Sequence, residues 1–204
     1  MKLPLAIVAL AFSGAAFAQN AEFWFSAGES IMENRSLGAA DPVLGTPNDF
    51  QIGETGFRFG FRGDLDTGDH LGYELSYAYS NTSLLYLGQS QGGANVHTVS
   101  GDVLWHFIKR DSRVRPFVMG GIGFSNFVPP GSSLYSGGNS NEFQFNYGVG
   151  VKVKAFSKWG KDFGFRADLD QFQYIGKPFG NLGLFRQSGN LQQTAATLGF
   201  GILF

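Results

Sequence analysis

The stretch GETGFRFGFRGDL, residues 53–65, alternates phenylalanine with small or charged residues through its centre. Successive side chains of a β-strand point to opposite sides, so the three phenylalanines share one face of an extended chain. Arg58 and Arg62 lie on the other face together with a glycine. The stretch therefore predicts a strand that separates an aromatic surface from a charged one.

The same two-residue period recurs along the chain from residue 22 onward. Eight stretches show it, and the links between them are rich in Gly, Pro, Asn, Asp and Ser. We predict eight strands, at residues 22–31, 53–63, 70–80, 95–108, 114–127, 142–155, 162–174 and 192–204.

The links between these strands alternate between long and short. The short ones are residues 64–69, 108–113 and 157–161, and each lies between two long ones. In an up-and-down arrangement, all the long links then lie at one end. Outer-membrane barrels have this asymmetry, with short periplasmic turns and longer extracellular loops. The sequence therefore predicts an all-β protein, an eight-stranded antiparallel up-and-down transmembrane β-barrel.

The composition indicates which face of each strand meets lipid. Charged residues make up 15% of the chain and aromatic residues 16%, whereas ordinary soluble domains carry about 25% charged residues. The interior of an eight-stranded barrel is just wide enough to be filled by side chains. It cannot take a ring of Phe and Tyr from every strand. We therefore expect the aromatic faces to point into hydrocarbon and the small and charged residues to line the lumen.

The first residues, MKLPLAIVALAFSGAAFA, have the order of a secretory signal peptide: a lysine, an apolar run, and Ala-Phe-Ala at the end. The alternative is a membrane anchor, but the apolar run from Leu3 to Phe12 is too short to span a bilayer as a helix. We expect a signal peptide at residues 1–18, cleaved before Gln19, and an outer-membrane β-barrel domain at 19–204.

Charged residues on the predicted lumen face form the candidate site. Buried charges must be paired or solvated, and the rough balance of sign favours a salt-bridge network that closes the lumen. The alternative is a gated pore, in which exchange of ion-pair partners opens a narrow channel for ions or small solutes. The residues are Arg58, Arg62, Glu74, Asp102, Lys152, Arg166 and Asp168.

The sequence offers little support for an enzyme. Its three histidines do not cluster, and neither a nucleophile elbow nor a phosphate-binding loop occurs. One alternative remains, a lipid-modifying enzyme with a site at the barrel rim formed by His97 and Ser100. We otherwise expect no catalysis, no cofactor and no metal. The absence of cysteine excludes a disulfide framework and a thiolate metal site. The net charge of −1 gives no indication of a nucleic-acid partner.

Two further sets of residues have a predicted place on the outer surface. Apolar residues in predicted loops suggest contact with a partner or folding over the barrel mouth, and the alternative is that they pack together or extend the strands. They are Leu84, Leu85, Tyr86, Leu87, Phe179, Leu182, Leu184 and Phe185. The candidates for interfacial aromatic girdles are Trp24, Tyr73, Tyr77, Tyr79, Trp105 and Tyr147.

The chain resembles the eight-stranded outer-membrane β-barrel domain family, whose better-known members are the OmpA-type and OmpX-type barrels. The resemblance covers residues 20–204. It rests on the signal peptide and on three stretches, RPFVMGGIGF (115–124), NYGVGVKVK (146–154) and TLGFGILF (197–204).

This resemblance implies a location in the outer membrane of a Gram-negative-type bacterium and a structural or surface-interaction role through four extracellular loops. The implied partners are outer-membrane lipid, lipopolysaccharide, a possible extracellular ligand at the loops, and the barrel-assembly machinery, which would read the terminal Phe204. The family's acid–arginine gate would match Glu74 or Asp102 with Arg58 or Arg166. Since no residues follow Phe204, we do not expect the wall-tethering role of OmpA-type proteins.

Overall fold

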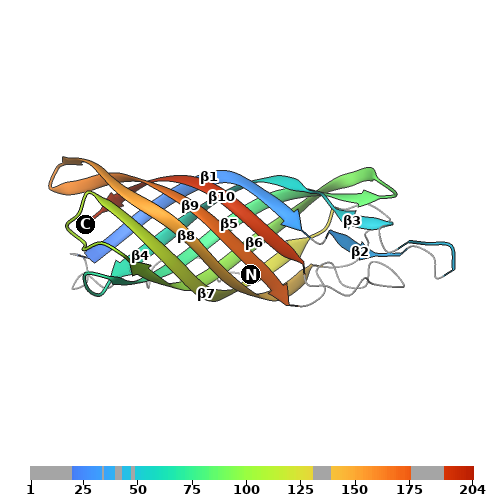
Figure 1. The fold of residues 1–204 in the computed structure, drawn as a ribbon. Helices are drawn as coiled ribbons and strands as arrows, with labels where there is room; N and C mark the ends of the chain where they lie inside the picture. The colour runs from blue at the N-terminus through green and yellow to red at the C-terminus, as the bar shows by residue number, and fades with distance from the viewer. Residues whose placement is uncertain (1–19, 34, 40–42, 47–48, 131–138, 176–190) are drawn as a thin grey trace, which may run out of the picture.

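A computed structural model of the chain describes residues 20–33, 35–39, 43–46, 49–130, 139–175 and 191–204. These residues form ten strands (Figure 1). Among them, no helix has the length and apolar character needed to cross a membrane. The strands are β1 Ala21–Glu33, β2 Ser36–Gly38, β3 Phe50–Ile52, β4 Thr55–Asp66, β5 Leu71–Tyr86, β6 Gln89–His106, β7 Val114–Val128, β8 Ser140–Lys158, β9 Lys161–Ile175 and β10 Gln192–Leu203.

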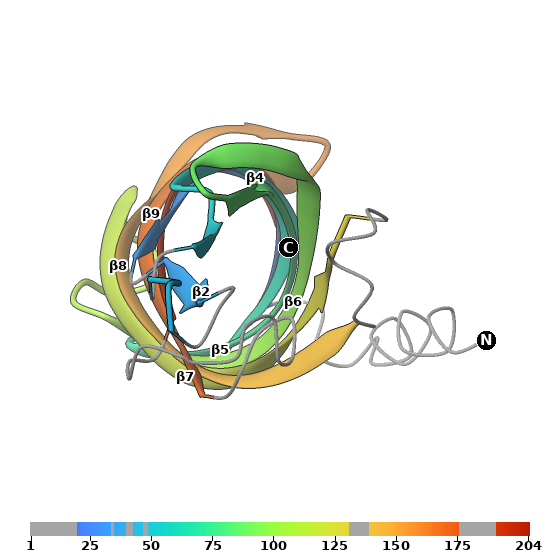
Figure 2. The ribbon, with the colours of Figure 1, turned by 90° about the vertical axis from the view of Figure 1, so that its right-hand side faces the viewer.

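Eight of the strands form a closed antiparallel ring, which Figure 2 shows from one end. Their order around the ring is β5-β4-β1-β10-β9-β8-β7-β6, and β6 pairs back to β5. The first and last strands of the ring pair from Glu22↔Leu203 to Glu33↔Gln192. A closed ring leaves no free sheet edge in the wall, which is the condition for strands to cross a bilayer. The predicted eight-stranded up-and-down barrel is confirmed.

The two ends of the barrel differ. One end, which we call the turn end, holds the start of β1, the end of β10 and the short connections at residues 67–70, 107–113 and 159–160. The opposite end, the loop end, holds the ends of β1, β5, β7 and β9 and the starts of β4, β6, β8 and β10, together with β2 and β3 (Figure 1). Looking at the loop end, Figure 2 shows β2 and β3 within the outline of the ring.

Residues 81–94 were predicted as a long loop, with extension of the strands as the alternative for its apolar residues, and the structure shows the extension. β5 and β6 continue past the ring as a hairpin, paired from Asn81↔Asn95 to Tyr86↔Gln89. Its turn is formed by Leu87 and Gly88, which both have positive φ angles, of 48° and 77°. Positive φ at both central residues is the conformation that a two-residue hairpin turn requires. The extension is supported from the side by β3, whose Phe50 pairs with Tyr86.

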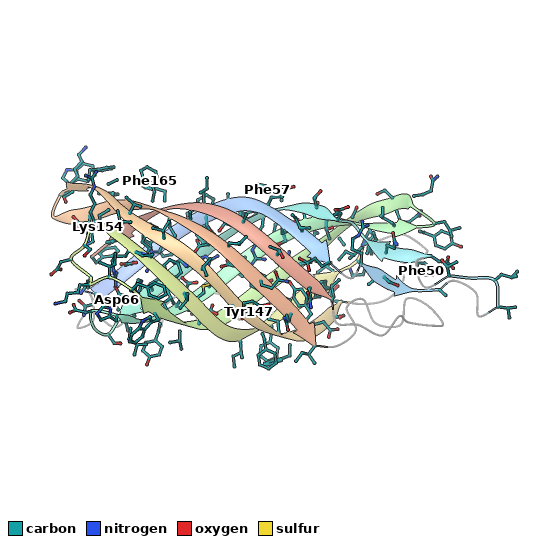
Figure 3. All side chains as sticks on the ribbon, in the orientation of Figure 1. Phe50, Phe57, Asp66, Tyr147, Lys154 and Phe165 are labelled. Carbon is teal, nitrogen blue, oxygen red and sulfur yellow. The ribbon has the colours of Figure 1, made fainter. Side chains whose placement is uncertain are left out.

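Burial alternates along the ring strands as the two-residue period predicts. On β4, Phe57 is 58% exposed while the adjacent Arg58 is 3% exposed. Figure 3 shows Phe57, Tyr147 and Phe165 on the outer surface of the ring. Four of the predicted girdle residues are also exposed on this surface, namely Tyr73, Tyr77, Trp105 and Tyr147.

Trp24 was predicted to lie in a girdle, and this prediction is wrong. Its side chain is fully buried inside the barrel, where Nε1 donates a hydrogen bond of 3.0 Å to Oε2 of Glu22. The indole lies over Gly201 of β10 and Gly164 of β9, which pair with each other. Even-numbered positions of β1 face inward, and the two glycines leave the volume that a buried indole needs.

The same pairing of a large residue with a glycine recurs throughout the lumen. A Cβ atom on Gly121 would lie 2.3 Å from Oδ1 of Asp102, and one on Gly148 would lie 2.6 Å from Oδ1 of Asp170. Several of the large inward side chains therefore fit because the residue paired with them on one neighbouring strand is a glycine. The cross-strand pairs are Asp66–Gly72, Asp102–Gly121, Asp168–Gly150, Asp170–Gly148, Arg166–Gly199 and Trp24–Gly201.

We predict that Gly201→Ala destabilises the barrel, because its Cβ would lie 2.3 Å from Cε3 of Trp24. Overpacking of this kind costs about 1–3 kcal/mol. The matched control is Gly101→Ala on β6, where a Cβ would have no atom within 4 Å. Urea unfolding in lipid vesicles measures both changes. Equal stability of the two variants would contradict this account of the interior.

Candidate functional site

A chain of buried ion pairs runs through the lumen and is the candidate functional site. Its members alternate in sign, and every one of them is at least nine-tenths buried. Each contact within it is a salt bridge between strands that the ring holds in fixed register. In order from mid-barrel to the turn end, the chain is Asp170, Arg62, Glu74, Arg166, Asp64, Lys152, Glu22, Arg115 and Asp66.

Glu74 joins two arginines at the centre of this chain. Its Oε1 lies 2.9 Å from Nη1 of Arg62, and its Oε2 lies 2.5 Å from Nη1 of Arg166. The second guanidinium nitrogen of Arg62 lies 2.5 Å from Oδ2 of Asp170. Arg166 also donates from Nε to Asp168, at 2.8 and 3.0 Å. Charge-assisted hydrogen bonds of this length are the strong class in proteins.

Towards the turn end, Lys152 and Arg115 continue the alternation. Nζ of Lys152 lies 2.6 Å from both Glu22 and Asp64. Nη1 of Arg115 lies 2.7 Å from Asp66 and 3.4 Å from Glu22. Lys152 thus connects the two halves of the chain, because Asp64 also contacts Arg166, at 3.0 Å.

The two-residue period of the strands supplies these charges in rows. β4 places Arg62, Asp64 and Asp66 on its inward face, and β9 does the same with Arg166, Asp168 and Asp170. β4 and β9 are not neighbours, because β1 and β10 lie between them in the ring. Contacts between the two rows, such as Arg62 with Asp170, therefore cross the lumen rather than run along the wall.

Five of the seven residues singled out in the sequence lie in this arrangement, namely Arg62, Glu74, Lys152, Arg166 and Asp168. Arg58 and Asp102 are buried but make no salt bridge among the described residues. Nη1 of Arg58 donates to Ser80 at 3.0 Å, and its guanidinium lies 4.5 Å from the ring centroid of Phe172. Asp102 accepts hydrogen bonds from Ser100 and Asn146.

Five members of the chain are not among those seven residues: Asp170, Glu22, Asp64, Asp66 and Arg115. Asp64 and Asp66 belong to the segment DLDTGD, which was predicted to be a turn. Asp64 and Asp66 lie two and four residues after Arg62, so the two-residue period of the strand would have placed both on the inward face with Arg58 and Arg62. Arg115 was used only as part of a family motif.

The acid–arginine pair that the family resemblance implies is only partly matched. Glu74 contacts Arg166, one of the expected combinations, but Arg62 rather than Arg58 is its second partner. A small cavity of about 10 Å³ separates Arg58 from the chain, and Ser100 and Asp102 also line it. Its volume is about the lower limit for holding one water molecule.

An apolar cluster fills the barrel above this cavity, towards the loop end. Its members come from six ring strands, from β2 and β3, and from Leu191 just before β10, so it joins the wall to the small strands. Leu84, which the sequence placed in an exposed loop, is fully buried in it. The members are Met32, Leu37, Ile52, Leu84, Ala94, Val96, Phe127, Phe172, Tyr174, Leu191 and Ala195.

The suggested pair of His97 and Ser100 does not form a catalytic site. His97 lies on the outer side of β6, where Nδ1 is 2.8 Å from the hydroxyl of Tyr77. Ser100 is buried in the lumen and donates to Asp102. The wall of the barrel separates the two side chains, because residues three apart in a strand point to opposite faces. Within the described residues, no group of three or more His, Asp or Glu side chains could hold a metal ion.

Some of the predicted surface residues cannot be placed. Phe179, Leu182, Leu184 and Phe185 lie outside the described residues, as does the expected signal peptide. Phe204 is described: its amide donates to the carbonyl of Ala21 at 2.9 Å, so the chain end is held against the first strand.

We predict that Glu74→Gln lowers the free energy of unfolding, because Arg62 and Arg166 both lose their shared anion. Removing one partner from a buried ion pair costs about 3–5 kcal/mol. The control is Asp69→Asn, which neutralises an exposed carboxylate at the turn end. Urea unfolding in vesicles compares the two variants, and a loss as small in Glu74→Gln as in the control would contradict a structural role for the chain.

Comparison with known proteins places this geometry among related folds. The sequence matches the outer membrane protein beta-barrel domain family over residues 5–204. The structure is similar to Neisserial surface protein A, at 14% identity, with 90% of this chain and 97% of that chain covered and a TM-score of 0.58. It is also similar to the outer membrane protein OprG from Pseudomonas aeruginosa, at 11% identity, with 91% and 97% covered and a TM-score of 0.57. No curated protein matches the sequence.

Proposed function

The chain belongs to the outer membrane protein beta-barrel domain family, and from this premise we propose that it is a closed barrel with a structural or surface-interaction role. The observation that carries the proposal is that side chains fill the lumen in two stacked groups. The ion-pair chain occupies the part nearer the turn end, and the apolar cluster occupies the part nearer the loop end.

Conduction through such a lumen would require both groups to move. Exchange of partners among Arg62, Arg166 and Glu74 could rearrange the lower group, but the cluster above it consists of apolar side chains apart from the hydroxyl of Tyr174, which is hydrogen-bonded to Gln193. An eight-stranded barrel also has an interior that side chains fill, whereas the barrels with aqueous channels have 16 or more strands. These considerations favour the closed barrel over the narrow gated channel.

The orientation follows from the difference between the two ends. We propose that the turn end faces the periplasm and the loop end faces the exterior, as in outer-membrane barrels generally. Residues 1–18 would serve as the export signal, and residues 19–204 would form the mature barrel. The barrel-assembly machinery would recognise the alternating last strand that ends in Phe204, and the aromatic outer surface would contact membrane lipid and lipopolysaccharide.

The loop end offers the surface for contact with a partner. Val43, Leu44 and Leu87 are exposed apolar residues there, and Leu87 forms the tip of the β5–β6 hairpin. Apolar side chains on a water-exposed tip favour contact with an extracellular ligand. We propose no catalytic role, since His97 and Ser100 lie on opposite sides of the wall.

We predict that the purified protein produces no discrete conductance steps in planar lipid bilayers, because two groups of side chains close the lumen. Two variants are measured alongside it. Glu74→Gln changes the ion-pair chain, and Arg58→Gln changes the buried arginine next to that chain. Steps in the unmodified protein that disappear in either variant would overturn the closed barrel and favour the gated channel.

We predict that a cysteine at the loop end reacts with a membrane-impermeant maleimide on intact cells, whereas one at the turn end does not. The chain contains no cysteine, so Ser90→Cys in the hairpin and Thr67→Cys in the β4–β5 turn each introduce a single exposed thiol. Both thiols should react after the cells are lysed, which is the control for accessibility. The reverse pattern on intact cells would show that the orientation is inverted.

A further inference from the structure

Basic side chains collect at the turn end of the barrel, four of them exposed and two, Arg110 and Lys154, half-buried. Six basic residues lie in the β6–β7 connection and in the β8–β9 hairpin, against three carboxylates outside the lumen at this end, Asp69, Asp111 and Asp162. Two of these residues lie near carboxylates, since Lys154 is 3.9 Å from Asp162 and Arg110 is 3.9 Å from Asp66. At the loop end, the described Arg35 pairs with Glu54 at 3.5 Å. The six basic residues are Lys109, Arg110, Arg113, Lys154, Lys158 and Lys161.

The β8–β9 hairpin carries Lys158 and Lys161 beyond the paired wall of the barrel. The β7–β8 pairing begins at Val114↔Val153, and the β9–β10 pairing ends at Asp162↔Leu203. The hairpin tip therefore projects past its neighbouring strands on both sides, as Figure 1 shows at the end near the C-terminus.

Aromatic side chains accompany the cations on this projection. Trp159 at the tip is 81% exposed, and Nζ of Lys158 lies 4.3 Å from its ring centroid. Nζ of Lys161 lies 3.5 Å from the ring centroid of Phe204. On the wall directly above, Phe156 stacks on Phe163 with ring centroids 5.1 Å apart. The cations thus adjoin the aromatic surface that faces hydrocarbon.

We propose that this basic and aromatic rim binds the headgroups of anionic phospholipids in the leaflet at the turn end. The rim comprises the six cations with Trp159 and Phe204. Tryptophan favours the membrane–water interface, and lysine and arginine near it contact headgroups while their stems lie on apolar surface. Each basic residue close to an anionic membrane surface strengthens binding by about fivefold. The inference rests on the transmembrane placement in the proposed function.

Phospholipid is the occupant that the position of the rim favours over a soluble partner. The cations are continuous with the lipid-facing wall, so the headgroups of the lipids that contact Phe156 and Phe163 lie within their reach. A phosphate group complements the excess of positive charge at this end. A polymer of the cell wall would meet the tip of the hairpin but not the Phe156–Phe163 surface beside it.

Fluorescence quenching of Trp159 tests the proposal. The full chain carrying Trp105→Phe is reconstituted in phosphatidylcholine vesicles that contain brominated phosphatidylglycerol or, separately, brominated phosphatidylcholine. Trp24 is buried in the lumen, so quenching by lipid reports on Trp159. We expect phosphatidylglycerol to bind several-fold better than phosphatidylcholine, with a preference that weakens as salt is raised.

The triple variant Lys109→Gln, Lys158→Gln and Lys161→Gln should lose this preference, whereas the same three positions changed to arginine should keep it. A control at the other end, Glu29→Gln with Glu33→Gln, should leave the preference unchanged. Equal quenching by the two lipids, or a preference that persists in the glutamine variant, would overturn the proposal. Soluble cell-wall glycopeptide that changes Trp159 emission in the absence of any lipid preference would also overturn it, in favour of a wall polymer.

The result of the lipid-quenching experiment can be distinguished from the results that test the proposed function. Both leaflets of the vesicles contain the same lipids, so the measured preference does not depend on which end of the barrel faces outward or on whether the lumen conducts. Failure here would leave the bilayer conductance and thiol-labelling results to decide the closed barrel and its orientation.

Discussion

The backbone pairing of β1 with β10 is the constraint on which the rest of the structure depends. It joins the first and last strands of the ring from Glu22↔Leu203 to Glu33↔Gln192 and leaves no free edge in the wall. In hydrocarbon an unpaired N–H or C=O would cost several kcal/mol. Once the ring is closed, each strand position faces either lipid or lumen, and a shift of one residue would exchange the two faces.

The small volume of the lumen then decides which residues can occupy it. Several of the large and charged side chains are accommodated because a glycine lies directly opposite on one neighbouring strand, as Gly121 does for Asp102 and Gly201 for Trp24. Buried charges are costly unless they are paired. The alternating chain around Glu74 meets this requirement by giving each cation at least two carboxylates. Glycine placement and charge pairing are thus two parts of one solution to packing a narrow, closed interior.

The side chains that fill the lumen and those that surround its two ends change along the barrel axis, and the proposed functions are based on this difference. Ion pairs fill the lumen nearer the turn end, and apolar side chains such as Leu84 and Phe127 fill it nearer the loop end. Outside the wall, cations and exposed aromatic residues lie together at the turn end, whereas the exposed residues Val43, Leu44 and Leu87 lie at the loop end. A closed lumen leaves the two ends of the barrel, rather than its interior, as the surfaces available for interaction.

The sequence by itself determined the number of ring strands and the face on which Phe57 and Arg58 lie, because both follow from a two-residue period and the narrowness of an eight-stranded interior. Only the tertiary structure decided which charges pair, since Arg62 and Asp170 are 108 residues apart and meet across the lumen. It also decided the inward position of Trp24 and the burial of Leu84. These depend on cross-strand register and on contacts with β2 and β3, which a local pattern does not specify because closure of the whole ring sets them.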